Sequence, residues 1–141
     1  MNLNIPYLET DNKLLNDAYR IAAGDIVGNI VYYQNGLLTE EKPCMIAGLD
    51  YNTPWTRDTA INIWNALSIL SPEVSKNTLL AVLEEEEGNI YISGQYWDSI
   101  IWMIGAREYC RFHKDDNFYR LAFEAGRNSV HRLEEDEFDE E

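Results

Sequence analysis

The sequence is short of basic residues. Its 141 residues include 11 lysines and arginines against 25 aspartates and glutamates, which gives a net charge of −14 at pH 7. A negative field of this size repels the phosphates of nucleic acids and of anionic lipid headgroups. We therefore expect neither a nucleic acid nor a membrane as a partner.

Long apolar runs are also missing. No stretch approaches the roughly 20 apolar residues that a membrane-spanning helix needs. The first ten residues, MNLNIPYLET, lack the basic start and apolar stretch of a signal peptide. These absences favour a cytoplasmic protein, although a mature periplasmic or secreted form would have the same features.

Residues that bind metals or react covalently are scarce. Cys44 and Cys110 are too few for a disulfide scaffold, and no base motif lies near either thiol. His113 and His131 are isolated and do not have the spacing of a metal site. Glycine-rich phosphate loops and the G-x-S-x-G motif are absent. We expect no metal and no cofactor.

What the sequence does contain is helical periodicity. Apolar residues recur at three- and four-residue spacing, which predicts helices over 11–33, 56–70, 72–86 and 95–113 and a fifth capped by Asp115 or Asp116. Thr10 or Asp11 is the predicted cap of the first helix, and Ser71-Pro72 the predicted start of the third. Only residues 90–92 favour an extended conformation. We therefore predict one all-α segment of helical hairpins over residues 1–141, without a convincing sheet.

Two acidic runs lie outside the apolar pattern. The run 84–87 precedes Gly88, which is typical of an exposed helix end followed by a glycine cap. The last eight residues, EEDEFDEE, carry seven acids and predict a solvated end of the chain.

The predicted helices 56–70 and 95–113 are apolar nearly all round. Trp64, Leu67 and Ile69 cannot share one narrow face, and neighbours such as Ile101 and Trp102 cannot do so either. Helices of this kind need cover on every side, and five helices of this length provide too few neighbours. The pattern favours a homo-oligomer or a piece of a larger layered helical array.

One cluster of aromatic and charged residues, D-Y-N-T-P-W-T-R-D, occupies residues 50–58. Carbohydrate sites use this mixture: an indole stacks on the apolar face of a sugar ring, a carboxylate accepts hydrogen bonds from adjacent hydroxyls, and a guanidinium donates in a fixed fork. The same residues also suit an ordinary helix start, with Thr56 as the cap, Asp58 as a first-turn acid and Trp55 as a packing residue.

A second cluster, S-G-Q-Y-W-D-S, occupies residues 93–99 at another predicted helix start. It again combines an amide, two aromatic rings, a carboxylate and a hydroxyl. The alternative is a capped helix, with Ser93 as the cap and Trp97 in the core. If the two apolar helices run parallel, both clusters lie at the same end and can line one concave site.

The stretch P-W-T-R-D-T-A-I, residues 54–61, closely resembles the W-T-R-D-[ST]-A-[IL] stretch of glucoamylases. The stretch 95–99 looks like the aromatic-acid helix starts of related sugar hydrolases. These enzymes form the six-hairpin glycosidase superfamily, whose fold is an (α/α)6 toroid with an inner and an outer ring of six helices. The resemblance implies that the two apolar helices belong to an inner ring.

By this resemblance Trp55, Arg57 and Asp58 would hold the terminal sugar, with Arg57 supporting Asp58, while Gln95, Trp97 and Asp98 line the same bowl. The family hydrolyses glycosidic bonds with two carboxylates, a general acid and a base that activates water. The resemblance places the acid in the acidic segment 133–141, where no single residue stands out, so the catalytic residues stay unknown. The second carboxylate of the family lies farther downstream and is absent here.

The chain also departs from the family. A toroid needs twelve helices, and this sequence predicts five. We therefore expect the front part of a glycoside hydrolase, inactive alone, that exposes apolar helix faces and associates through them. The alternatives are a non-catalytic helical module that binds a protein partner and a non-catalytic module that binds a sugar.

Overall fold

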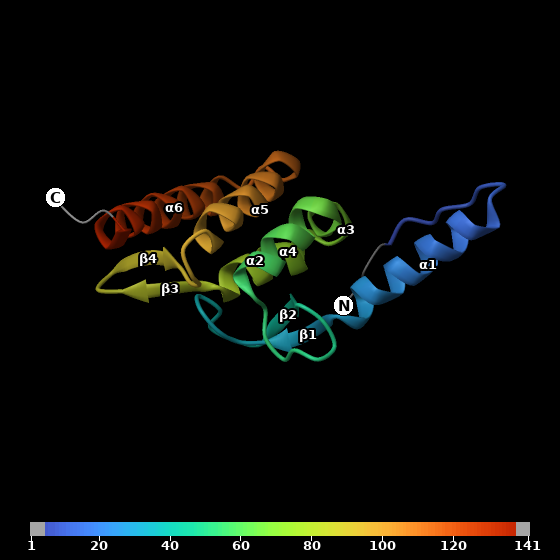
Figure 1. Ribbon diagram of the computed structural model, residues 1–141, viewed down its shortest axis with the longest axis horizontal. Coiled ribbons are helices and arrows are strands. Elements are labelled where there is room, and N and C mark those ends of the chain that lie inside the picture. The colour runs from blue at the N-terminus through green and yellow to red at the C-terminus, as the bar shows by residue number, and fades with distance from the viewer. Residues whose placement is uncertain (1–4, 138–141) are drawn as a thin grey trace.

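The computed structural model describes residues 5–137 and is rich in helix (Figure 1). The main helices are α1 (Lys13–Gly28), α2 (Thr56–Asn62), α4 (Pro72–Ala81), α5 (Asp98–Phe112) and α6 (Asp116–Glu137). A π-helical stretch, Ile63–Leu67, joins α2 to the short α3 (Ser68–Leu70), so that residues 56–70 form one continuous helical run as predicted. The prediction of a helix-rich chain is confirmed.

The prediction of no sheet is wrong. Strand β1 (Ile30–Tyr33) pairs antiparallel with β2 (Lys42–Met45), so that Ile30 lies opposite Met45. The first helix therefore ends at Gly28 and not at residue 33, because the β-branched and aromatic run of β1 favours a strand once a partner is available. Asn12, one residue after the predicted caps, begins this helix through its side-chain oxygen, which accepts hydrogen bonds from the next turn.

A second hairpin replaces the predicted end of the third helix. Helix α4 stops at Ala81, and β3 (Leu83–Glu86) pairs antiparallel with β4 (Asn89–Ile92). Glu87 and Gly88 have φ values of 52° and 81°, as a two-residue type I′ turn requires. The acidic run 84–87 therefore lies along a strand and its turn and is not an exposed helix end, whereas the extended stretch 90–92 is confirmed.

Local capping explains where the later helices begin. Ser71 accepts a hydrogen bond from the amide of Val74, as its position before Pro72 predicts. Asp115 accepts one from the amide of Phe118 at 3.0 Å and caps α6. Helix α5 begins at Asp98 and not at 95, and no side chain caps it at Trp97, so the predicted cap by Ser93 is wrong.

Helices α2 and α5 run parallel and side by side. Gly105 of α5 lies against Ala60 of α2, where an added Cβ would come within 2.8 Å of the Ala60 Cα. At the far end of the pair, Nε2 of His113 lies 2.6 Å from the carbonyl oxygen of Ser68. The condition for placing both aromatic clusters at one end of the fold is therefore met.

Helices α4 and α6 cover one side of this pair. The Trp102 indole of α5 is fully buried and donates a hydrogen bond to the carbonyl oxygen of Leu79 in α4 at 3.3 Å. Its ring also packs near Phe118 of α6. Ser129 of α6 accepts from the amide of Ile92, which ties the second hairpin to the same layer. The core lies between the inner pair and these outer helices.

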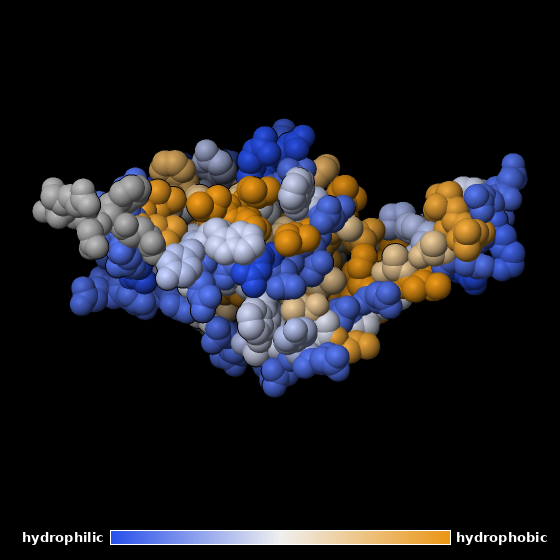
Figure 2. All heavy atoms as spheres, viewed as in Figure 1, coloured by the Kyte–Doolittle hydropathy of each residue, from blue (hydrophilic) through white to orange (hydrophobic). Residues whose placement is uncertain are grey.

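The other side of the α2–α5 pair is uncovered by residues 5–137. Several large apolar side chains of the two helices are about half exposed, namely Ile61, Trp64, Ile100 and Ile104. Figure 2 shows apolar side chains over the middle of the molecule and along α1, which projects away from the body. The expectation of incompletely covered apolar helices is confirmed for the described residues.

Candidate functional site

The two aromatic clusters meet through Arg57. Its Nη1 donates a hydrogen bond to Asp98 Oδ1 at 2.7 Å, and its guanidinium carbon lies 5.0 Å from the centre of the Trp97 ring. Arginine combines both contacts well because its planar group can pair with a carboxylate at its edge while stacking on an aromatic face. The predicted clusters at residues 50–58 and 93–99 are therefore neighbours in space.

A second link fixes the two segments to each other. Thr56 Oγ1 donates to the carbonyl oxygen of Ser93 at 2.8 Å, across 37 residues of sequence. The Thr56 hydroxyl therefore binds the neighbouring segment and does not cap α2. The alternative in which Thr56 is the cap of an ordinary helix start is wrong. This hydrogen bond holds the first turn of α2 against the segment that leads into α5.

The indoles of both clusters remain accessible. Trp55 is 48% exposed and Trp97 is 54% exposed. Tyr51 meets Trp55 edge to face, with ring centres 5.8 Å apart, a geometry that aromatic pairs prefer. These contacts leave part of the ring surface of Trp55 and of Trp97 open to solvent.

Asp98 lies beneath this surface. It is only 7% exposed, and its second oxygen, Oδ2, accepts a hydrogen bond from the Gln95 amide at 3.1 Å. Gly94 closes the other side, because an added Cβ there would lie 2.8 Å from the same oxygen. Gly94 also has a φ of +120°, which other residues rarely adopt. Asp98 is thus a fixed and shielded carboxylate.

Asp58 is in a different position. It is partly exposed in the first turn of α2, where the partial positive charge of a helix start favours a carboxylate. Arg57 pairs with Asp98 and not with Asp58, so the expected support of Asp58 by its neighbour is replaced by a long-range ion pair. Asp58 is therefore more accessible than Asp98.

Gln95 borders a separate cleft. Its backbone amide binds Asp98, but the residue also lines a polar cleft of about 560 Å³ between the β3–β4 hairpin and α6, together with Tyr96 and Arg132. Tyr96 has a φ of 34°, unusual for a non-glycine residue. Such backbone strain is concentrated at functional sites, and no pattern in the sequence indicates it.

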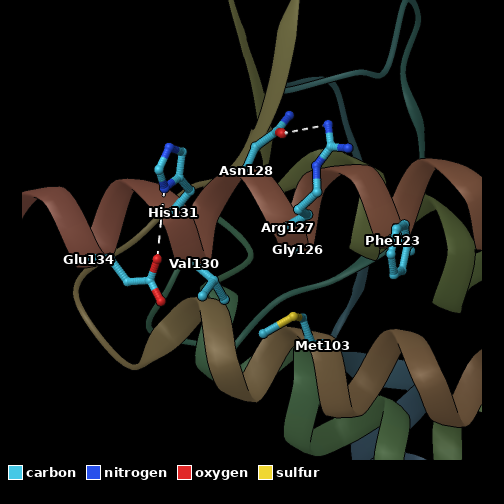
Figure 3. A pocket seen from close by; sticks show the side chains of 9 residues that line it. Met103, Phe123, Gly126, Arg127, Asn128, Val130, His131 and Glu134 are labelled. Carbon is cyan, nitrogen blue, oxygen red and sulfur yellow. Dashed lines mark hydrogen bonds and ion pairs between the residues drawn. The ribbon is translucent and has the colours of Figure 1, made fainter.

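Another cleft, of about 750 Å³, lies between α5 and α6 and has a different character. Figure 3 shows Met103 and Val130 pointing into the gap, while Arg127 and Asn128 pair with each other away from it. Its lining is mainly apolar, and its His131 is an exposed residue that approaches Glu134 and Glu135 of its own helix. This cleft lacks the converging polar groups of a catalytic site.

The acidic segment contains no shielded acid among its described side chains. Helix α6 continues through Glu137, and Glu134, Glu135 and Asp136 are exposed. A general acid needs a position that raises its pKa by excluding water. Residues 138–141, which belong to the same predicted segment, lie outside the described residues.

Large pKa shifts occur at Cys44 and Tyr109, which lie outside the two aromatic clusters. Burial raises the pKa of the Cys44 thiol to about 12, as expected for an unreactive buried cysteine. Burial and the nearby Asp115 carboxylate raise the pKa of Tyr109 to about 12. Within residues 5–137, no group of three or more histidine, cysteine or acidic side chains is arranged to hold a metal ion.

Comparisons with protein-family models, with curated proteins and with solved structures gave no match. Among the described residues, no helix combines the length and the apolar character needed to cross a membrane.

Proposed function

We propose that the corner formed by Trp55, Arg57, Asp58 and Trp97 binds the terminal ring of a carbohydrate. The single observation that carries this proposal is the contact of Arg57 with both Asp98 and Trp97. It joins two clusters of carbohydrate-binding composition that lie 41 residues apart. Open indole faces can stack on a sugar ring, while Asp58 accepts hydrogen bonds from its hydroxyls.

The resemblance of residues 54–61 to glucoamylases supports a glycoside hydrolase. In that proposal α2 and α5 are neighbouring inner helices of an (α/α)6 toroid, and α4 and α6 are outer ones. The parallel inner pair and its one-sided cover are compatible with this arrangement. The full enzyme would protonate the glycosidic oxygen with one carboxylate and activate water with another. We expect this chain alone to be inactive, because the acidic segment in which the resemblance places the general acid has no shielded acid among its described side chains.

Sugar binding can be measured directly by two-dimensional NMR of the full chain titrated with glucose or maltose. We expect shifts of the Trp55 and Trp97 indole N–H signals that saturate, with a millimolar Kd. Asp58→Asn should weaken this binding about tenfold, the size of one lost charge-assisted hydrogen bond. Asp116→Asn is the matched control, because Asp116 is also a first-turn acid but lies at the start of α6.

Three results would contradict parts of the proposal. Absence of any saturable shift at both indoles would exclude sugar binding at this corner. Hydrolysis of maltose by the purified chain at enzyme-like rates would contradict the expectation of an inactive chain. Unchanged binding by Asp58→Asn would remove Asp58 from the site.

Self-association through the uncovered helix face is expected both of a front part of a hydrolase and of the alternative, a non-catalytic helical binding module. The occupant that we propose for the uncovered α2–α5 face is a second copy of this chain. The face carries Ile61, Trp64 and Ile100, and burial of these apolar side chains would have to offset the repulsion between two chains of net charge −14. Its half-exposed residues offer roughly 500 Å² per copy, which reaches the lower limit of a specific interface. Sedimentation should show dimers, and Trp64→Glu should give monomers.

A further inference from the structure

The charged groups of the candidate site differ in how far they are buried. Arg57 and Asp98 form a close ion pair in which the carboxylate is buried and the guanidinium is one-third exposed. Asp58 is partly exposed beside them. One positive and two negative groups leave the corner with a net charge of −1, although an arginine stands at its centre.

We propose that Asp98 is a positioning residue which cancels the charge of Arg57, so that the site accepts neutral sugars and rejects anionic ones such as sugar phosphates and uronic acids. This inference rests on the proposed function and specifies its substrate class. It also changes the role of Asp98, which the sequence suggested as a residue that touches the sugar.

The first argument is geometric. Asp98 has both oxygens occupied, Oδ1 by Arg57 at 2.7 Å and Oδ2 by the amide of Gln95 at 3.1 Å. Gly94 presses against the side chain from the other side, since a Cβ there would clash with Oδ2. A carboxylate that is 7% exposed and held in this way can orient a neighbour but cannot reach a ligand.

The second argument concerns Arg57 itself. The ion pair fixes one edge of its guanidinium, and Trp97 fixes one face at 5.0 Å. The remaining N–H groups still donate hydrogen bonds to a neutral hydroxyl or ring oxygen. An incoming phosphate or carboxylate, however, meets an arginine whose charge is already compensated at close range, and it meets the negative charge of Asp58 as well.

The test replaces Asp98 by asparagine, which keeps the shape and removes the charge. Trp97 indole and Arg57 Nε–H signals are followed by NMR during titration with inorganic phosphate at constant ionic strength. We expect Asp98→Asn to bind phosphate at Arg57 about tenfold more tightly than the wild type, because one charge contact has been removed. Asp98→Asn should also have a smaller ratio of glucose affinity to glucuronate affinity than the wild type.

Glu108→Gln is the matched control. Glu108 is equally buried in α5 and binds Arg111 through both oxygens at 3.0 Å, so this variant makes the same change in charge at a distant site. It should leave phosphate binding at Arg57 unchanged. The double variant Arg57→Gln, Asp98→Asn should not show the tighter phosphate binding of Asp98→Asn, because it lacks the arginine that would bind phosphate.

The outcomes separate this inference from the proposed function. If no variant binds glucose, the sugar proposal fails, yet the phosphate titration still decides whether Asp98 neutralises Arg57. If folded Asp98→Asn binds phosphate no better than the wild type or Glu108→Gln, the inference is wrong. If Asp98→Asn does not fold, the wild type decides: equal affinity for glucose and glucuronate overturns the inference, and a clear preference for glucose supports it.

Discussion

Helices α1 and α5 have nearly the same length, 16 and 15 residues, but opposite surroundings. Helix α5 buries Trp102, Ala106 and Tyr109 in the core, whereas no residue of α1 is buried by residues 5–137. An isolated helix as short as α1 is only marginally stable in water. Its support is mainly local, from the Asn12 cap and from the ion pairs of Lys13 and Arg20 with Asp17, although Ile26 near its end packs partly buried against the core. Similar periodicity therefore accompanies very different contributions to stability.

The largest difference should appear on truncating one apolar side chain in each helix. Trp102→Ala removes a fully buried indole together with its hydrogen bond to Leu79, and should lower the free energy of unfolding by about 3–5 kcal/mol. Leu14→Ala in α1 removes a side chain that is 78% exposed and should change it by less than about 0.5 kcal/mol. Urea unfolding followed by circular dichroism measures both. Equal losses would show that α1 packs against a partner in solution.

Glycine-to-alanine substitutions should have opposite signs in the two helices. At Gly105 the new Cβ would come within 2.8 Å of Ala60, so Gly105→Ala should push α2 and α5 apart and cost about 1–3 kcal/mol. At Gly24 in α1 nothing lies within 4 Å of the new atom, so Gly24→Ala should raise helix stability by about 1 kcal/mol. Thermal unfolding of the two variants tests this directly. A stabilising Gly105→Ala would contradict the close approach of the inner helices.

A smaller difference in stabilisation is expected between two acids that form ion pairs, Asp115 before α6 and Asp17 in α1. The Lys76 ammonium at 2.6 Å and the amide of Phe118 lower the pKa of Asp115. Its stabilisation is therefore complete above the unfolded pKa of about 3.9 and is lost as the pH falls through the lower folded value. Asp115→Asn keeps a capping side chain but removes the charge that pairs with Lys76, and should cost about 1 kcal/mol at pH 7.

Below the folded pKa of Asp115, the difference between wild type and variant should vanish. Unfolding experiments across a pH series measure this. Asp17→Asn is the comparison in α1, where Lys13 and Arg20 lower the pKa of an exposed carboxylate. Water screens both ion pairs of Asp17, so Asp17→Asn should have almost the same free energy of unfolding as the wild type. A persistent cost of Asp115→Asn at low pH would mean that shape and not charge matters at that position.

Local signals predicted much of the chain. The run 56–70, the start at Ser71-Pro72 and the cap at Asp115 were all visible in side-chain types and spacing. The two hairpins were not, because Ile30–Tyr33 and Leu83–Glu86 are strands only with their partners in place. Apolar spacing alone cannot distinguish the end of a helix from a short strand that follows it.

Some features of the candidate site could likewise be predicted from the sequence, and others could not. Its residue types and their places near two helix starts follow from the sequence. The partner of Arg57 does not, because neighbouring Asp58 and distant Asp98 are equally good in chemical terms and only the packing of α5 on α2 brings Asp98 within 2.7 Å. The strained backbone at Tyr96 and the shielding of Asp98 by Gly94 are likewise products of the assembled fold.

The sequence by itself determined a helix-rich, strongly acidic chain with two aromatic and charged clusters and with helices too apolar to remain uncovered. These properties depend on residue type and on spacing within one or two turns. Only the tertiary structure decided which face of α2 and α5 is covered, which carboxylate pairs with Arg57 and which remains accessible. Those outcomes depend on contacts between residues some 40 positions apart, and local propensity carries no information about them.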